Sequence, residues 1–111
     1  MSRETIDITP AEVSERRDEV QLIDVREPYE WEAGRIGGAR HVELPRVASE
    51  APTIDRERPV VFYCRVGARS TMAASAFRRA GYDAYSMDGG LEAWSRDGLP
   101  LEPAGGTVAA H

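Results

Sequence analysis

The chain has 111 residues, of which 41% are hydrophobic and 30% are charged, a balance typical of one soluble globular domain. Its formal net charge of -5 at pH 7 argues against general nucleic-acid binding, which needs a basic face. No run approaches the roughly 20 apolar residues that cross a bilayer, and the first ten residues carry no apolar signal segment, so we expect a cytoplasmic protein without membrane contact.

Short apolar runs alternate with helical stretches along the chain. We expect strands over residues 6–8, 21–25, 40–42, 59–64 and 83–87. We expect helices that begin at Pro10 after Thr9, cover 28–33 before Gly34, and then span 44–51, 70–80 and 90–98. Strands that alternate with helices in this way predict βα units around a largely parallel sheet.

The helix expected over residues 70–80 carries small and apolar side chains along one face. That face comprises Met72, Ala73, Ala76, Phe77 and Ala80. After residue 100 the chain is rich in glycine, alanine and proline. We therefore expect residues 1–100 to form a single domain and residues 101–111 to form a flexible C-terminal tail.

The segment VVFYCRVGARST, residues 60–71, carries the candidate chemistry. Cys64 ends the clearest strand, and ligands of parallel sheets bind outside the carboxyl ends of the strands. Gly67 can adopt the positive φ that a tight return into the next helix needs. The backbone N–H groups of residues 65–69, the helix N-terminus and the side chains of Arg65 and Arg69 would then surround the sulfur with positive charge.

Such surroundings favour the thiolate form of a cysteine and bind a small anion beside it. We therefore interpret Cys64 as a nucleophile within a substrate-binding loop. The loop comprises Arg65, Val66, Gly67, Ala68 and Arg69. The alternative is that Cys64 is a small buried hydrophobic residue and that the arginines are solvated surface residues.

The types of basic residue, cysteine and histidine in the chain exclude several kinds of catalytic site. All 14 basic residues are arginine, so chemistry that needs a lysine, such as a Schiff base, is excluded. Because Cys64 is the only cysteine, the chain cannot form an internal disulfide, a C-x-x-C redox pair or a multi-thiolate zinc site. His41 and His111 form no evident histidine base or metal motif, and we expect neither a metal nor an organic cofactor.

Three segments together resemble the rhodanese family of sulfurtransferases, in its single-domain type. CRVGAR, residues 64–69, is similar to the six-residue loop that begins with the persulfide-forming cysteine. IDVREPYEWEAGRIGGARHVELP, residues 23–45, resembles the signature D-V-R-x-x-x-E-[YF]-x-x-G-H-I-x-G-A, with Arg35 where the family most often has histidine. MDGGLEAWSRDGLP, residues 87–100, resembles the closing G-G-x-x-x-W segment.

The resemblance implies an α/β fold with a central, mainly parallel five-stranded sheet flanked by helices on both faces. It implies a thiosulfate sulfurtransferase in which Cys64 carries a persulfide. A small anionic donor would load the sulfur, and cyanide, a thiol or a protein would accept it. Family members that favour mercaptopyruvate tend to have a smaller, uncharged residue at the position of Arg65, so this arginine favours thiosulfate.

The resemblance also implies that Asp24 supports the loop by pairing with a loop arginine, namely Arg65. The alternative for Asp24 is a strand-end carboxylate that caps a turn. We do not expect Arg35 to change the chemistry, because its position normally supports the fold. Several further residues are interpreted as structural, namely Arg26, Glu27, Trp31, His41, Asp88 and Trp94.

Two other functions compete with sulfur transfer. Related cysteine-loop phosphatases and arsenate reductases use C-x5-R, whereas Cys64 and Arg69 make C-x4-R, a smaller cradle that suits a sulfur atom better than a tetrahedral phosphate. The second alternative is a non-catalytic binding module of the same fold. Such modules typically lose the cysteine or its loop, and this chain keeps both.

Overall fold

The computed structural model describes residues 3–111, over which five strands form one sheet with the order β1-β5-β4-β2-β3. Every strand pair in the sheet is parallel. The strands are β1 (Asp7–Ile8), β2 (Gln21–Asp24), β3 (Arg40–His41), β4 (Val60–Tyr63) and β5 (Ala84–Met87). The expected α/β fold with a central parallel five-stranded sheet is confirmed.

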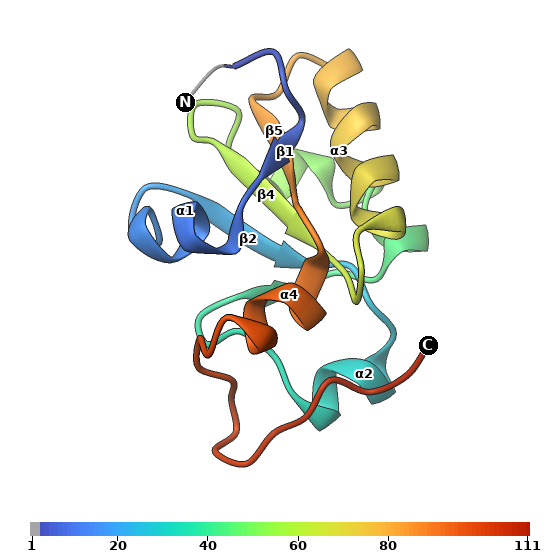
Figure 1. Ribbon diagram of the computed structural model, residues 1–111. Helices are drawn as coiled ribbons and strands as arrows, with labels where there is room; N and C mark the ends of the chain where they lie inside the picture. Colours follow the sequence, from blue (N-terminus) through green and yellow to red (C-terminus); the bar gives the residue numbers. More distant parts are fainter. Residues whose placement is uncertain (1–2) are drawn as a thin grey trace.

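Helices cover both faces of this sheet (Figure 1). The helices are α1 (Pro10–Glu15), α2 (Pro28–Ala33), α3 (Ala68–Arg79) and α4 (Gly90–Arg96). α3 lies on one face, while α1 lies on the other and contacts α4. The predicted ends of two short helices are also correct, because the Thr9 hydroxyl accepts a hydrogen bond from the Glu12 N–H and Gly34 caps α2.

The alternation of side chains along β4 divides the core into two clusters. Val60, Phe62 and Cys64 point toward the face that α3 covers, where they pack with Phe77. Val61 and Tyr63 point toward the opposite face with residues of α1 and α4. A parallel strand buried on both faces needs such a continuous apolar run, which is why residues 59–64 are a clear strand in the sequence. The Cys64 side chain consequently lies on the α3 side of the sheet.

Two sequence predictions about helices are wrong in detail. Residues 44–51 were expected to be one helix, but they hold the short 3₁₀ turn Leu44–Arg46 and only the start of a second, Ala51–Thr53. Pro52 interrupts a continuous helix because it has no N–H to donate, and it is tolerated at the start of the second turn. On α3, Ala73 and Phe77 are buried as part of the inner face, but Met72, Ala76 and Ala80 are exposed, Met72 by 64%.

Residues 101–111 run back along α2, and the C-terminus lies near that helix in Figure 1. The main chains of Arg35 and Glu102 exchange two hydrogen bonds, and the Thr107 N–H donates to the Ala33 carbonyl at 2.8 Å. The Tyr29 hydroxyl donates to the Ala110 carbonyl at 3.0 Å. The flexibility of this segment and the domain boundary at residue 100 stay predictions.

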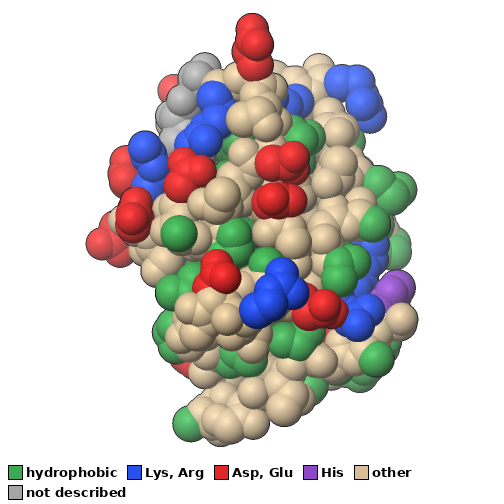
Figure 2. Space-filling view, in the orientation of Figure 1, with side chains coloured by type: hydrophobic (Ala, Val, Ile, Leu, Met, Phe, Trp, Pro, Cys, Tyr) green, Lys and Arg blue, Asp and Glu red, His purple; other side chains and the backbone are tan. Residues whose placement is uncertain are grey.

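The outer surface carries charges of both signs. On the face drawn in Figure 2, arginine side chains are interspersed with aspartate and glutamate side chains. In the part of the chain described, no helix is both long and apolar enough to span a bilayer.

Candidate active site

Cys64 follows directly on the end of β4 and is the floor of the candidate site. Its side chain is 1% exposed and belongs to the core cluster beneath α3. The next residues turn sharply, and the N–H of Gly67 returns to donate to Cys64 Sγ at 3.1 Å. A backbone N–H aimed at the sulfur stabilises negative charge on it.

The turn above the sulfur is shorter than the sequence suggested. Gly67 has φ 119°, a value that strongly favours glycine, and it lets the chain enter α3 at Ala68 instead of near Ser70. Arg65 and Val66 therefore lie in the turn itself, whereas Ala68 and Arg69 form the first turn of the helix. The N-terminus of this 12-residue helix lies beside Cys64, as expected.

The start of α4 supports the turn from below. The Leu91 N–H donates to the Cys64 carbonyl at 2.8 Å, and the Glu92 N–H donates to the Arg65 carbonyl at 3.0 Å. Gly90 allows this close approach, because a Cβ atom there would lie 2.5 to 2.6 Å from the carbonyl groups of Cys64 and Arg65. The closing G-G segment of the sequence therefore has a direct mechanical role in holding the loop.

Arg69 is fixed by an acidic partner that the sequence interpretation missed. Both Arg69 Nη atoms contact Glu30 of α2, at 2.8 and 3.0 Å, and the Glu30 side chain is 0% exposed. Burial opposes ionisation of Glu30, but the hydrogen bonds from Arg69 and from the Glu27 N–H outweigh it, so the pKa of Glu30 is lowered below its ordinary value. The available signal was the fixed glutamate of the D-V-R-x-x-x-E pattern, which Glu30 occupies.

Arg65 is anchored on the other side of the turn. Its Nη2 atom lies 2.9 Å from Glu92 Oε2, and both side chains are partly exposed. Its Nε atom is buried and has no hydrogen-bond partner within residues 3–111. A buried donor without a partner is uncommon in folded proteins, and Arg65 Nε is such a donor beside the turn.

Asp24 does not pair with Arg65, and that expectation is wrong. Its carboxylate instead contacts the Arg26 side chain at distances down to 2.7 Å, and both side chains are fully buried. Arg26 also donates to the Gly34 carbonyl at 2.7 Å, which ties the end of β2 to the end of α2. The side chain of Asp24 thus organises the segment that carries Glu30.

The sequence of the whole domain matches one family. Residues 9–97 match the family described as Rhodanese-like domain. The chain belongs to the rhodanese-like family.

Relatives of this rhodanese-like chain extend over most of its length. It is 36% identical over 101 residues to a thiosulfate sulfurtransferase GlpE of Pseudomonas aeruginosa, covering 89% of this chain and 91% of that protein. It is 36% identical over 85 residues to a sulfurtransferase of Allochromatium vinosum, covering 76% and 79%. A solved rhodanese-like domain protein of Staphylococcus aureus is similar, with a TM-score of 0.76, 27% identity, and coverage of 85% of this chain and 95% of that one.

Arg35, at the position where the family most often has histidine, takes a structural role in this rhodanese-like domain. Its Nη1 atom donates to the Trp31 carbonyl at 3.0 Å, and its guanidinium lies 4.8 Å from the centre of the Trp31 ring. The same ring stacks on His41, whose Nε2 atom lies 2.7 Å from the Arg26 carbonyl oxygen. The structural interpretation of His41 is confirmed, while the effect of Arg35 on the chemistry stays a prediction.

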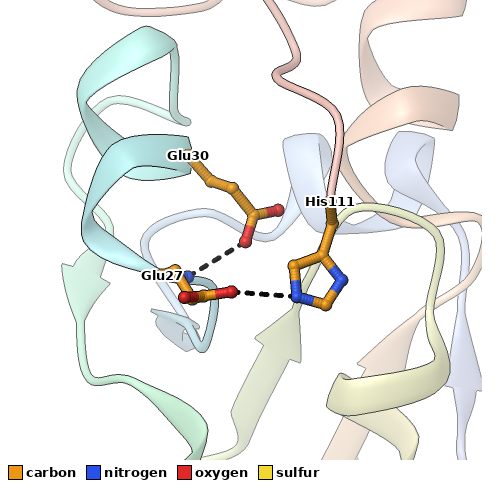
Figure 3. Close-up of side chains that lie close together, drawn as sticks. All are labelled: Glu27, Glu30 and His111. Carbon is orange, nitrogen blue, oxygen red and sulfur yellow. Dashed lines mark hydrogen bonds and ion pairs between the residues drawn. The ribbon is translucent and has the colours of Figure 1, made fainter.

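A cavity of about 240 Å³ opens beside Arg69, bounded by Val25, Glu27, the segment 43–45 and His111. At its edge, Glu27, Glu30 and His111 approach one another, with ligand atoms within 4.8 Å (Figure 3). Protein donors already engage these carboxylates, since Glu27 pairs with His111 at 3.0 Å and Glu30 pairs with Arg69. These contacts form a hydrogen-bonded network around the start of α2.

Proposed function

We propose that this chain is a sulfurtransferase that moves a sulfane sulfur from thiosulfate, through a persulfide on Cys64, to a thiophilic acceptor. The observation that carries the proposal is the contact of Cys64 Sγ with the Gly67 N–H inside a turn that two anchored arginines flank. The names of the relatives that match most of the chain support the same reaction.

In the first half of the reaction, the Cys64 thiolate attacks the outer sulfur of thiosulfate. A new S–S bond forms to Cys64, the S–S bond within thiosulfate breaks, and sulfite leaves with the bonding electron pair. The negative charge of the persulfide then lies on its outer sulfur. The backbone N–H groups at the start of α3 are the donors that would stabilise it, without any metal or organic cofactor.

In the second half, an acceptor nucleophile attacks the outer sulfur. With cyanide as acceptor, a C–S bond forms, the S–S bond to Cys64 breaks, and its electron pair returns to Cys64 as a thiolate. Thiocyanate leaves, and the enzyme is ready for another donor. Because donor and acceptor react in separate steps at one atom, ping-pong kinetics are expected.

The loop residues divide this work. Arg65 would attract the anionic donor with its partly exposed guanidinium, and Arg69 holds the first turn of α3 against α2. Val66, Gly67 and Ala68 present backbone rather than side-chain groups to the donor. Asp24 supports the loop indirectly, through its pair with Arg26.

The chemistry of the site also supports a proposal for the donor and the acceptor. The positive charge of Arg65 favours the dianion thiosulfate over the monoanion mercaptopyruvate. Cyanide, a small thiol or a protein thiolate would each serve as acceptor. The reaction needs a free thiol, which a reducing compartment maintains, so we also propose that the protein acts in the cytoplasm.

Intact mass after incubation with thiosulfate, and again after cyanide, tests the proposal. Wild type should gain the mass of one sulfur atom and lose it on addition of cyanide, whereas Cys64→Ser should show neither change while remaining folded. Transfer that persists in Cys64→Ser would overturn the assignment of the nucleophile. Hydrolysis of an aryl phosphate without any mass gain would instead support the phosphatase alternative.

A further inference from the structure

A line of hydroxyl groups leads from Cys64 into the protein. Ser70 Oγ, in the first turn of α3, lies 3.5 Å from Cys64 Sγ. Ser86 Oγ, on β5, lies 2.8 Å from Ser70 Oγ. The Thr71 hydroxyl then donates to Ser86 Oγ at 3.3 Å. These four side chains, from the end of β4, from α3 and from β5, form one hydrogen-bonded series that ends at the Cys64 sulfur.

The two serines occupy positions where polar groups are costly. Both are fully buried beneath α3, and Ser86 lies on the same side of β5 as Ala84, which belongs to the apolar cluster there. A buried hydroxyl is tolerated when its hydrogen bonds are satisfied, and here each serine satisfies the other. An alanine at either position would pack there without needing any hydrogen bond. Packing alone therefore does not explain why both positions are serine.

The orientation of the Ser70 hydroxyl lets the series fit both the thiol and the thiolate form of Cys64. Ser70 can donate either to the Gly67 carbonyl, at 3.1 Å, or to Cys64 Sγ. When Cys64 is a thiol, its S–H donates to Ser70 Oγ and the Ser70 hydroxyl donates to Gly67. When the thiol proton has left to solvent water, the Ser70 hydroxyl turns to donate to the thiolate.

The rest of the series keeps one direction in both states. Thr71 donates to Ser86, and Ser86 donates to Ser70, so that each hydroxyl strengthens the next as a donor. The thiolate then accepts two hydrogen bonds, one from Ser70 and one from the Gly67 N–H. Hydrogen bonds to a charged acceptor are roughly twice as strong as neutral ones.

We propose that Ser70, supported by Ser86, is a positioning residue that stabilises the Cys64 thiolate at the start and end of each transfer cycle. The proposal rests on the proposed function in one respect, namely that the thiolate is the nucleophile. It adds a side-chain hydrogen-bond donor, the Ser70 hydroxyl, to the backbone donors of the loop that face the sulfur. It also gives a role to Ser86, which lies 22 positions after Cys64 and belongs to none of the motifs discussed above.

Charged groups on the surrounding elements are already paired, and the serine variants leave them untouched. The pairs are Asp24–Arg26 at the end of β2, Arg69–Glu30 between α3 and α2, and Arg65–Glu92 between the turn and α4. A change in the ionisation of Cys64 on replacing a serine would therefore report the lost hydroxyl.

The first measurement is the ultraviolet absorbance of the thiolate as a function of pH. Cys64 is the only cysteine, so Cys64→Ser supplies the baseline for every other absorbing group. Where the thiolate is a minor species in wild type, Ser70→Ala should contain about tenfold less of it, and Ser86→Ala should show a smaller loss in the same direction. Ser75→Ala, a serine on the same helix but outside the series, should match wild type.

The second measurement separates positioning from a general structural role. The kcat/KM for thiosulfate should fall about tenfold in Ser70→Ala at neutral pH and should recover toward wild type at high pH, where the thiolate forms without help. A loss that is equal at every pH, or a thiolate curve of Ser70→Ala that matches Ser75→Ala, would overturn the proposal. Circular dichroism checks that each variant is folded. If Ser70→Ala does not fold, the same measurements on Ser86→Ala test the proposal.

The two proposals can fail separately. The absorbance measurement needs no sulfur donor, so a thiolate effect without any mass gain from thiosulfate would overturn the proposed function and leave the serine assignment intact. A mass gain from thiosulfate without any effect of the serine variants on the thiolate would support the proposed function and overturn the serine assignment.

Discussion

Glu30→Gln tests whether the buried ion pair behind the loop stabilises the fold. Glu30 is 0% exposed, and both of its carboxylate oxygens accept hydrogen bonds from Arg69, at 2.8 and 3.0 Å. Glutamine has nearly the same shape but replaces one oxygen with an NH₂ group. One Arg69 N–H would then face another donor, while the Glu27 N–H could keep its acceptor.

The size of the effect follows from this exchange. A lost hydrogen bond to a charged group costs about 1.5 to 3 kcal/mol. The Arg69 side chain retains 17% exposure, so water recovers part of the lost interaction. We therefore expect the free energy of unfolding at pH 7 to fall by about 2 kcal/mol in Glu30→Gln.

The effect should also depend on pH with a definite sign. The pKa of Glu30 is lowered in the folded protein, so the charged carboxylate contributes stability above its unfolded pKa. That contribution is lost as the pH falls through the folded pKa, because wild type then also carries a neutral side chain at position 30. The difference between wild type and Glu30→Gln should consequently shrink toward acid pH, while contributions from all other carboxylates cancel.

Urea unfolding of both proteins between pH 7 and acid pH measures this difference. Glu32→Gln, an exposed position on the same helix, is the matched control and should change stability by less than about 0.5 kcal/mol. A Glu30→Gln effect no larger than that of the control would refute the reasoning. An effect that grows as the pH falls would refute it as well.

Three further predictions concern the elements that hold the site. Gly90→Ala should destabilise the protein by about 3 kcal/mol, because the added Cβ would meet the backbone of the turn. Gly98→Ala is the control, since a Cβ there has open space, and it should cost about 1 kcal/mol. Thermal unfolding compares the two variants. Tyr63→Phe removes the acceptor of the buried Ile36 N–H and should cost about 1 to 3 kcal/mol by urea unfolding. Residues 101–111 should exchange amide hydrogens faster than the strands, and protection equal to that of β4 would contradict a flexible tail.

The sequence was sufficient to predict the sheet and the location of Cys64, the proposed nucleophile. Residues 59–64 form a continuous apolar run because β4 lies at the centre of a parallel sheet, and that run leads directly to Cys64. Gly67 marks the turn, since its φ of 119° disfavours other residues. Each of these signals is local, and each depends on backbone geometry within a few residues.

The partners of the charged side chains could not be predicted in the same way. Arg69 and Glu30 are 39 positions apart, and only the parallel crossovers bring α2 and α3 together. Asp24 has Arg26 two positions away, and the close bidentate contact between them excludes the longer-range pair expected with Arg65. The buried face of α3 was misassigned because it follows the small residues Ser70, Ala73 and Ala74 with Phe77, and the large apolar Met72 lies outside that stripe.

The pairing of both loop arginines changes how the site must handle charge. Arg65 and Arg69 were expected to be two free cations around the sulfur, but each is bound to a glutamate, so most of their charge is balanced before a donor arrives. The groups left for the sulfur are neutral dipoles: the Gly67 N–H, the start of α3 and the Ser70 hydroxyl. Such dipoles stabilise a thiolate or a persulfide, while Arg65, paired with Glu92, attracts the dianionic donor less strongly than a free cation would. This arrangement suits an enzyme that must release sulfite in every cycle, since the arginines fix the shape of the loop while dipoles stabilise the charge on the sulfur.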